Sequence, residues 1–232
     1  MHLPPLSNRL QSCYQLINKG ERVADIGCDH GYLGIHLLHN NIAKFVIAAD
    51  VNELPLASAQ TNARRFGTSD KMSFHLSDGA QNIPHDFDVM VCAGMGADTM
   101  ISILDAAPWL KDPKYRLVLQ CQSRRPELRK YLYQEGYTIT RETLAEDGKF
   151  IYTVMEIVYK PSQPLTEGQY HISPALLQDN SPLLPAFYDR VVGGLKTTVD
   201  GLSRSGGEKY EHYKEVLSQL LELEDSIHGN CL

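Results

Sequence analysis

Apolar runs and helical stretches alternate from residue 6 to about residue 160. Five runs are apolar almost throughout and have the length of buried strands: 22–27, 45–50, 72–76, 87–92 and 116–120. Stretches with the spacing of amphipathic helices lie before and between them: 6–17, 32–38, 53–66, 99–106 and 126–135. Strands that are apolar on both faces fit a parallel sheet covered by helices, so the alternation predicts a doubly wound α/β fold.

The pattern changes after residue 136. Residues 137–144 and 150–159 are both rich in β-forming side chains, and the Asp147-Gly148 pair between them is a strong signal for a tight turn. These segments predict an antiparallel hairpin that closes the sheet. Such a sheet resembles that of the Rossmann-like class I methyltransferases, whereas nucleotide-binding dehydrogenases usually continue with further helix–strand units.

A proline-containing segment at 161–164 precedes a different C-terminal pattern. Apolar side chains recur three, four or seven residues apart across 183–202 and again across 210–227. Two amphipathic helices in an antiparallel, coiled-coil-like hairpin explain this spacing. The sequence therefore predicts a Rossmann-like domain at 1–160 and a small helical domain at 161–232.

Composition is that of an ordinary soluble globular protein. The 232 residues are 43% hydrophobic, and 22 Lys and Arg side chains stand against 28 Asp and Glu, for a net charge of −6. This charge argues against a protein that coats nucleic acid through bulk charge, but it allows a local basic surface. No membrane helix or signal peptide is predicted, so a cytoplasmic location is expected. An odd, scattered set of cysteines without a CxxC pair predicts free thiols and no metal site: Cys13, Cys28, Cys92, Cys121 and Cys231.

The most informative segment spans residues 23–33 and reads VADIGCDHGYL. A strand with an acid near its end is followed by a turn and a helix, and Gly27 and Gly31 let the backbone lie close to a ligand. The glycine spacing differs from the G-x-G-x-x-G pattern that holds the pyrophosphate of a dinucleotide. S-adenosylmethionine has no phosphate, and its methionine end carries a positive charge beside a sulfonium. Acids such as Asp25 and Asp29 therefore suit it.

Acidic residues stand at or just after the ends of three successive strands. In an open α/β sheet such strand ends line one crevice, so Asp25, Asp50 and Asp78 are expected to converge there. Asp50 can accept both ribose hydroxyls of the cofactor, and Asp78 can accept the adenine amino group. Asp29 as a helix cap and Asp50 as a plain turn residue are the structural alternatives. The residues expected to bind the cofactor are Asp25, Gly27, Cys28, Gly31, Asp50, Val51, Asp78, Gly79, Ala93 and Gly94.

The segment Ala93-Gly94-Met95-Gly96 follows the fourth strand. It lacks the Asp/Asn-Pro-Pro motif found where an exocyclic amino group is methylated. Its glycines predict backbone close to the cofactor or the base, with Met95 as an apolar wall. This suits methylation of a ring nitrogen, whose lone pair attacks the sulfonium methyl group without a general base. A glycine-rich helix entry with Met95 in the core is the alternative.

Two glutamines stand at and just after the end of the fifth strand, and a set of arginines follows them. A carboxamide can pair with an adenine edge, although a solvated loop explains these glutamines equally well. His30 also suits a loop position. The residues expected to contact the reacting base, as catalytic candidates, are Asp29, His30, Met95, Gln120 and Gln122. The basic side chains predict either a phosphate-contacting rim or a solvated helix face: Arg124, Arg125 and Arg129.

Together these motifs resemble the bacterial tRNA (adenine-22-N1)-methyltransferase family, over nearly the whole chain. The carriers of the resemblance are Leu6-Ser7-Asn8-Arg9-Leu10, the segment 25–33, Ala93-Gly94-Met95-Gly96, Leu117-Val118-Leu119-Gln120, and Glu146-Asp147-Gly148-Lys149 with Tyr152. The chain departs from the family pattern at Ala97, where a second glycine is usual. It also departs at Cys121 and Gln122, where proline and asparagine are usual.

The resemblance implies S-adenosylmethionine as cofactor, tRNA as partner, and methyl transfer to N1 of an adenine at position 22 in the D-arm. It also implies that Arg9, Asp29 and His30 lie near the substrate, and that the C-terminal helices help to hold tRNA. A monomer is favoured over an oligomer. Two other functions stay open: methylation of another RNA nitrogen or of a small molecule, and binding of RNA or nucleotide without catalysis.

Overall fold

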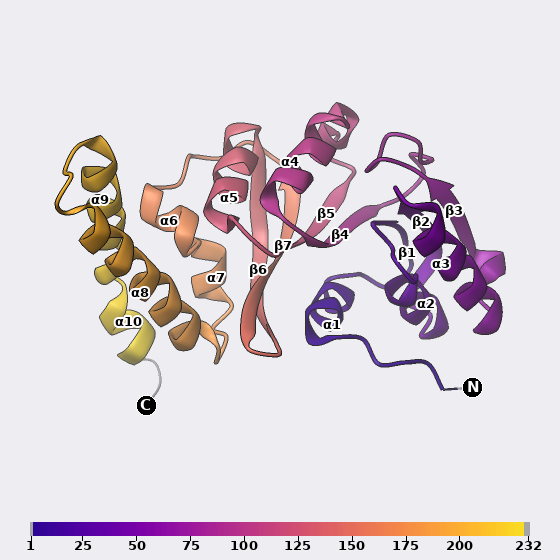
Figure 1. Cartoon of the computed structure of the whole chain (residues 1–232). Coiled ribbons are helices and arrows are strands. Elements are labelled where there is room, and N and C mark those ends of the chain that lie inside the picture. Colours follow the sequence, from indigo (N-terminus) through magenta and orange to yellow (C-terminus); the bar gives the residue numbers. More distant parts are fainter. Residues whose placement is uncertain (1, 230–232) are drawn as a thin grey trace.

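A seven-stranded sheet runs through the protein (Figure 1). The computed structural model describes residues 2–229, so Cys231 lies outside the described residues. The strands are β1 Glu21–Ile26, β2 Ala43–Asp50, β3 Met72–Leu76, β4 Val89–Met95, β5 Arg116–Cys121, β6 Tyr137–Asp147 and β7 Phe150–Tyr159. Their order across the sheet is β3-β2-β1-β4-β5-β7-β6.

The first five strands are parallel, and β7 and β6 complete the sheet in antiparallel pairing. This confirms the predicted Rossmann-like sheet closed by a C-terminal hairpin. The strand order reverses between β1 and β4, where Ile26 lies opposite Cys92. Open α/β sheets bind ligands at the carboxyl ends of the strands beside such a reversal. The loop after β1 and the end of β4 therefore lie at the expected position for a site.

Helices cover both faces of the sheet. The helices of the first face are α1 Asn8–Gln15, α2 Tyr32–His39 and α3 Glu53–Arg65, and those of the second are α4 Ala97–Asp105 and α5 Arg125–Gln134, with 3₁₀ turns at Ser69–Lys71 and Pro108–Lys111. Val89 and Val91 of β4 pack into one core, and Met90 and Cys92 pack into the other. Burial on both faces explains why these strands are apolar throughout.

The C-terminal part is a group of five helices on one side of the molecule (Figure 1). They are α6 Glu167–His171, α7 Pro174–Gln178, α8 Leu184–Leu202, α9 Glu208–Leu221 and α10 Glu224–Gly229. The single helix expected at 210–227 is in fact α9 and α10, because the chain turns at residues 222–223. The short α6 was not predicted, although Thr166 and Gln169 form a capping box whose spacing is visible in the sequence.

These C-terminal helices share a hydrophobic core with the hairpin. Leu144 of β6 and Ile151 of β7 belong to the same buried cluster as Leu176, Phe187 and Leu220. A continuous apolar core of this kind fixes the helices against the end of the sheet. Across residues 2–229, no helix is long and apolar enough to cross a membrane, and no group of three His, Cys, Asp or Glu side chains could hold a metal ion.

Candidate active site

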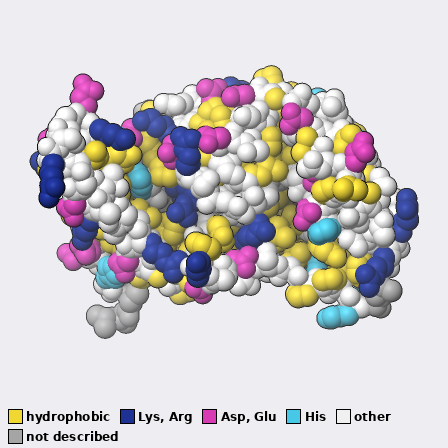
Figure 2. All heavy atoms as spheres, viewed as in Figure 1, with side chains coloured by type: hydrophobic (Ala, Val, Ile, Leu, Met, Phe, Trp, Pro, Cys, Tyr) yellow, Lys and Arg dark blue, Asp and Glu magenta, His cyan; other side chains and the backbone are white. Residues whose placement is uncertain are grey.

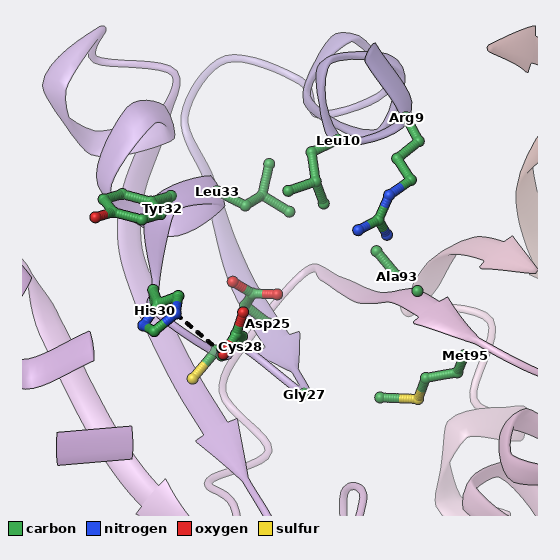
Figure 3. A pocket seen from close by; sticks show the side chains of 12 residues that line it. Arg9, Leu10, Asp25, Gly27, Cys28, His30, Tyr32, Leu33, Ala93 and Met95 are labelled. Carbon is green, nitrogen blue, oxygen red and sulfur yellow. Dashed lines mark ion pairs between the residues drawn. The ribbon is translucent and has the colours of Figure 1, made fainter. Parts of the chain in front are cut away.

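The carboxyl ends of β1 and β4 border a cavity of about 290 Å³ (Figure 3). Its lining residues come from α1, β1, the loop after β1, α2 and β4: Arg9, Leu10, Asp25, Gly27, Cys28, Asp29, His30, Tyr32, Leu33, Ala93, Gly94 and Met95. Sequence reasoning did not single out Leu10, Tyr32 and Leu33 as site residues. All three nevertheless stand inside the segments that carried the family resemblance, which is the signal that could have found them.

Glycine is required in the loop after β1 for two separate reasons. Gly27 and Gly31 both have φ +71°, a left-handed conformation that side chains with a Cβ rarely adopt. A Cβ at Gly27 would also collide with the terminal methyl group of Met95, and one at Gly31 would lie 3.0 Å from the Cβ of Ala59. The Gly31 N–H donates to the carbonyl of Cys28 at 2.8 Å, which closes the turn before α2.

Asp25 is the buried acid of the cavity. Its side chain lies at the end of β1 with a residue exposure of only 4%. Burial, together with repulsion from Asp50, raises the pKa of this carboxyl group from 3.8 to about 7. Among the described residues, no cationic group forms an ion pair with Asp25 within 4.0 Å. A ligand that brings a positive charge into the cavity would therefore stabilise the ionised form.

Asp50 binds the backbone of the two loops beside it. One carboxylate oxygen accepts the N–H of Asn52 at 2.9 Å, and the other accepts the N–H of Asp29 at 3.2 Å. The side chain thus sets the position of the glycine loop. Asp78 is exposed just after β3. The backbone N–H of Ser77, the residue before it, donates to the carbonyl of Asp50 at 2.9 Å and connects the end of β3 to the end of β2. The three acids therefore stand at or just after the carboxyl ends of neighbouring strands, but only Asp25 lines the cavity.

Three other residues expected to bind the cofactor also lie outside this cavity. Val51 is 60% exposed directly after β2. Gly79 has φ +57° and lies tightly against Ile103 of α4, and Gly31 supports the turn described above. They shape or border the site, and their contact with the cofactor stays a prediction.

The opposite wall is organised by Gln120. Its side-chain oxygen accepts the N–H of Gly94 at 2.9 Å and Nη1 of Arg9 at 3.2 Å. Gln120 has no exposed surface, and its Nε2 finds no hydrogen-bond partner among residues 2–229. The direct pairing with an adenine edge that the sequence suggested is therefore corrected, because this carboxamide lies beneath the cavity wall. It positions Gly94 and Arg9, and Arg9 also pairs with Asp147 at 3.4 Å.

The end of β4 differs from the sequence-based expectation. The strand continues through Met95, with a register shift between Ala93 and Met95 against β5. Gly94 has φ +81° at this irregularity, so the segment is a bulged strand end rather than a loop. Met95 is half-buried and packs against the core while its side chain forms part of the cavity wall.

Asp29 and His30 lie at the mouth of the cavity on the exposed part of the loop. Their side chains approach each other, with 3.7 Å between His30 Nε2 and Asp29 Oδ1 (Figure 3). The N-cap residue of α2 is Gly31, and no described side chain caps this helix, so Asp29 does not serve as a side-chain cap. Both groups are accessible to a ligand that enters from solvent.

The sequence matches the protein family described as "Methyltransferase domain" over residues 6–155. The chain belongs to this methyltransferase family. It is 35% identical over 146 residues to the tRNA (adenine(22)-N(1))-methyltransferase of Bacillus subtilis, covering 62% of this chain and 61% of that relative. A putative tRNA methyltransferase of Mycoplasma pneumoniae is 32% identical over 193 residues, covering 79% of this chain and 87% of that relative.

A solved structure has the same fold over nearly the whole chain. TrmK of M. capricolum, in complex with the cofactor product S-adenosyl-homocysteine, superposes with a TM-score of 0.80 and 26% identity. The comparison covers 97% of this chain and 100% of that protein, so it includes the C-terminal helices. The cavity described above thus belongs to a fold in which a relative binds the product of S-adenosylmethionine.

The protein does not form the basic rim that was expected along α5. Arg129 has no exposed side-chain surface and pairs with Glu142 at 2.5 Å, so its assignment as a phosphate contact is corrected. Arg124 is exposed, but Asp98 at 2.6 Å and Glu127 at 3.3 Å compensate its charge. Glu127 lies three residues further on in the first turn of α5, whereas Asp98 lies on α4, which the local sequence around Arg124 does not identify as a partner.

Gln122 and Arg125 do not line the cofactor cavity, although Gln122 lies next to its wall at Gly94 and Met95. Gln122 is exposed just after β5, and Arg125 is half-buried at the start of α5. Both line a second cavity beside the hairpin. The structure thus brings half of the predicted cofactor residues together in one cavity, and the predicted substrate residues are divided between the two cavities and positions outside both.

Proposed function

We propose that the protein transfers the methyl group of S-adenosylmethionine to N1 of adenine 22 in the D-arm of tRNA. The observation that carries the proposal is the cavity at β1 and β4, in which a buried acid without a cationic partner among the described residues lies beside a glycine loop. The named relatives, a tRNA (adenine(22)-N(1))-methyltransferase among them, support the choice of substrate.

The donor set of the cavity fits this cofactor. Asp25 would receive the ammonium group of the methionine end, and the turn at Gly27 would let the cofactor lie directly against backbone. Asp50, at the next strand end, would take the ribose hydroxyls, as acids do at this position in related nucleotide sites. When bound, the cofactor supplies an electrophilic methyl group on a positively charged sulfur.

Catalysis by the protein is mainly positioning. Adenine N1 carries a lone pair, so no general base is needed before attack, and the reacting atoms only need to be held in line. Met95 supplies an apolar wall, and Arg9, fixed by Gln120 and Asp147, supplies a cation at the mouth. Asp29 and His30 lie on the other side of the mouth and would contact the entering nucleotide.

The two predicted domains have separate roles in this proposal. Residues 1–160 would form the catalytic unit, and residues 161–232 a helical unit that helps to hold tRNA. The buried cluster that joins Leu144 and Ile151 to α7–α10 supports a fixed arrangement of the two. A tRNA substrate also implies a cytoplasmic location, and we expect one copy of the chain to suffice.

The decisive experiment is methylation of an unmodified tRNA transcript with labelled S-adenosylmethionine, followed by digestion to nucleosides. We expect the label in 1-methyladenosine, and no label when adenine 22 of the transcript is replaced by guanine. Label in N6-methyladenosine would contradict the assigned atom, and label that persists in the guanine transcript would contradict the assigned position. Absence of any label, with cofactor bound, would favour a protein that binds RNA without catalysis.

Gly27→Ala should lower both the stability of the fold and the affinity for the cofactor, for two different reasons. The left-handed conformation costs an alanine about 1–2 kcal/mol, so the free energy of unfolding in urea should fall by that amount. The new methyl group also displaces the Met95 side chain, and we expect the Kd for S-adenosylmethionine to rise about tenfold. Gly148→Ala is a matched control, because Gly148 has φ +62° and a Cβ added there would meet nothing within 4 Å among the described residues. Gly148→Ala should lower the free energy of unfolding through backbone strain but leave the Kd for S-adenosylmethionine unchanged. If the two variants bind the cofactor equally well, the proposed contact between the cofactor and the Gly27 loop is refuted.

A further inference from the structure

A second cavity of about 190 Å³ lies where the tip of the β6–β7 hairpin meets α5 and α8. Aromatic and guanidinium groups dominate its lining, which includes Phe150, Tyr152, Phe187, Arg125 and Arg190. None of the described residues that line it is acidic. It is separate from the cofactor cavity, and the proposed methyl transfer assigns it no role.

Backbone carbonyls, rather than carboxylates, hold the two arginines. Arg125 Nη1 donates to the Ile151 carbonyl at 3.2 Å, and its guanidinium lies 4.9 Å from the centre of the Phe187 ring. Arg190 Nη1 donates to the Lys149 carbonyl at 3.0 Å. Within the part of the chain that the structure describes, neither has a carboxylate within 4.0 Å. The cavity therefore presents two positive charges that no acid of the described chain neutralises at close range.

An aromatic ring is exposed beside these charges. Phe150 is 53% exposed at the hairpin tip, and its ring centre lies 6.1 Å from that of Tyr152. Large apolar side chains that stay in water at the rim of a cavity commonly mark an interaction site. Aromatic rings combined with arginine planes are the groups on which proteins stack unpaired bases, with nearby cations for the phosphates.

The two cavities are connected through shared structural elements. Gln122 lines the second cavity, and its backbone N–H donates to the carbonyl of Met95, which lines the first, at 2.9 Å. The hairpin that carries Phe150 also carries Asp147, the ion-pair partner of Arg9 at the mouth of the cofactor cavity. Figure 2 shows basic and apolar side chains together along the hollow between the C-terminal helices and the rest of the molecule.

We propose that this second cavity binds an unpaired nucleotide of the RNA substrate, outside the one that is methylated. Its base stacks on Phe150 and Tyr152, and Arg125 and Arg190 receive its phosphate. The inference rests on the proposed tRNA substrate and extends it with a second contact. Two contacts on one chain fix the orientation of the RNA, so that the target adenine enters the first cavity.

The test uses the full chain, unmodified tRNA transcript and S-adenosylmethionine. Phe150→Ala and Arg190→Ala should each raise the KM for tRNA about tenfold, the effect of losing one stacking or phosphate contact, with the Kd for S-adenosylmethionine unchanged. Phe150→Trp, which keeps an aromatic ring at this position, should have the wild-type KM, unlike Phe150→Ala. Arg64→Ala is the matched control and should keep the wild-type KM, because Arg64 is an exposed arginine in the last turn of α3, outside the C-terminal helical unit and among the lining residues of neither cavity.

Fluorescence of the Phe150→Trp variant gives a readout that does not require methylation. Wild-type protein has one tryptophan, Trp109, which stacks on His85 and serves as the background signal. We expect tRNA to quench the additional emission. If wild-type protein methylates tRNA but the variants keep its KM and show no quenching, the second site is refuted and the methyltransferase function stands. Quenching without methylation would refute the methyltransferase function but not the second site. The absence of both methylation and quenching would refute the function and the second site together.

Discussion

Asp25→Asn should abolish binding of S-adenosylmethionine and, at the same time, stabilise the free protein above neutral pH. Asp25 is buried in the cavity, and its pKa is raised from 3.8 to about 7 by burial and by repulsion from Asp50. Asparagine keeps the shape of the side chain but removes the charge that would pair with the ammonium group of the cofactor. We expect no heat of binding in calorimetry at micromolar protein.

The direction of the stability effect follows from proton linkage. The folded protein retains the Asp25 proton up to about pH 7, whereas the unfolded chain releases it near pH 4, so the folded state holds more protons in this range. The Asp25 contribution to stability is therefore greatest below pH 4 and is lost as pH rises to about 7. The pKa difference corresponds to up to about 4 kcal/mol, which the asparagine variant should regain.

Thermal unfolding at pH 5 and pH 8 measures this effect. The Tm of Asp25→Asn should exceed that of wild type by clearly more at pH 8 than at pH 5. Asp70→Asn, a change of the same kind at an exposed residue, should show no such difference. A variant with the wild-type pH dependence of Tm would show that Asp25 is already ionised in the free protein.

Cofactor binding should also release protons. The pKa of Asp25 is raised to about 7, so near neutral pH the binding of a cation beside its carboxyl group should release a fraction of a proton per molecule. Calorimetry in two buffers of different ionisation enthalpy measures this number. Proton uptake instead of release would contradict a charge pair between Asp25 and the cofactor.

Arg129→Met should lower the free energy of unfolding by about 3–5 kcal/mol, because it leaves Glu142 buried without a cation. The pair joins α5 to β6 and has no exposed side-chain surface. Arg129 Nη1 also donates to the carbonyl of Tyr170 at 2.8 Å, and the Ser173 hydroxyl donates to Glu142. The network thus connects the sheet domain with the start of the C-terminal helices. Urea unfolding followed by circular dichroism gives the measurement.

The double variant Arg129→Met/Glu142→Leu separates charge from packing. It removes both charges, so most of the lost stability should return. Arg124→Met, which removes an exposed partner of Asp98, is a control for loss of an arginine and should change the free energy of unfolding by at most about 1 kcal/mol. If the double variant is as unstable as the single one, the loss comes from the arginine's packing and its other hydrogen bonds.

Local patterns predicted the elements of the sheet with small errors at their ends. The helix expected at 6–17 is α1 Asn8–Gln15, and the strand expected at 22–27 is β1 Glu21–Ile26. The hairpin formed as expected, because the Asp147-Gly148 pair determines a tight turn without help from distant residues. The break between α9 and α10 was not expected, because the apolar spacing continues through it to Ile227, which packs into the same core.

The candidate site shows where such reasoning ends. The glycine loop and Asp25 were identifiable, because a strand, a tight turn and a helix N-terminus form from adjacent residues. Gln120 was interpreted as a base contact, yet it is buried beneath Gly94 and Arg9, which lie far from it in sequence. Whether a polar side chain faces the cavity or lies beneath its wall depends on the residues that pack over it. For Gln120 these residues come from α1 and β4, which lie elsewhere in the sequence.

By itself, the sequence determined which segments of the sheet domain form strands and helices, the turn that forms one side of the cofactor cavity and the hairpin that closes the sheet. Each depends on side-chain periodicity or on backbone conformations that neighbouring residues impose. Only the tertiary structure decided which arginines are exposed, which are buried and which acids they pair with. Arg124, Arg125 and Arg129 stand together in the sequence, but one pairs at the surface, one lines a second cavity and one is buried. Their environments differ because the residues around each come from α4, the hairpin and β6, which only folding brings to them.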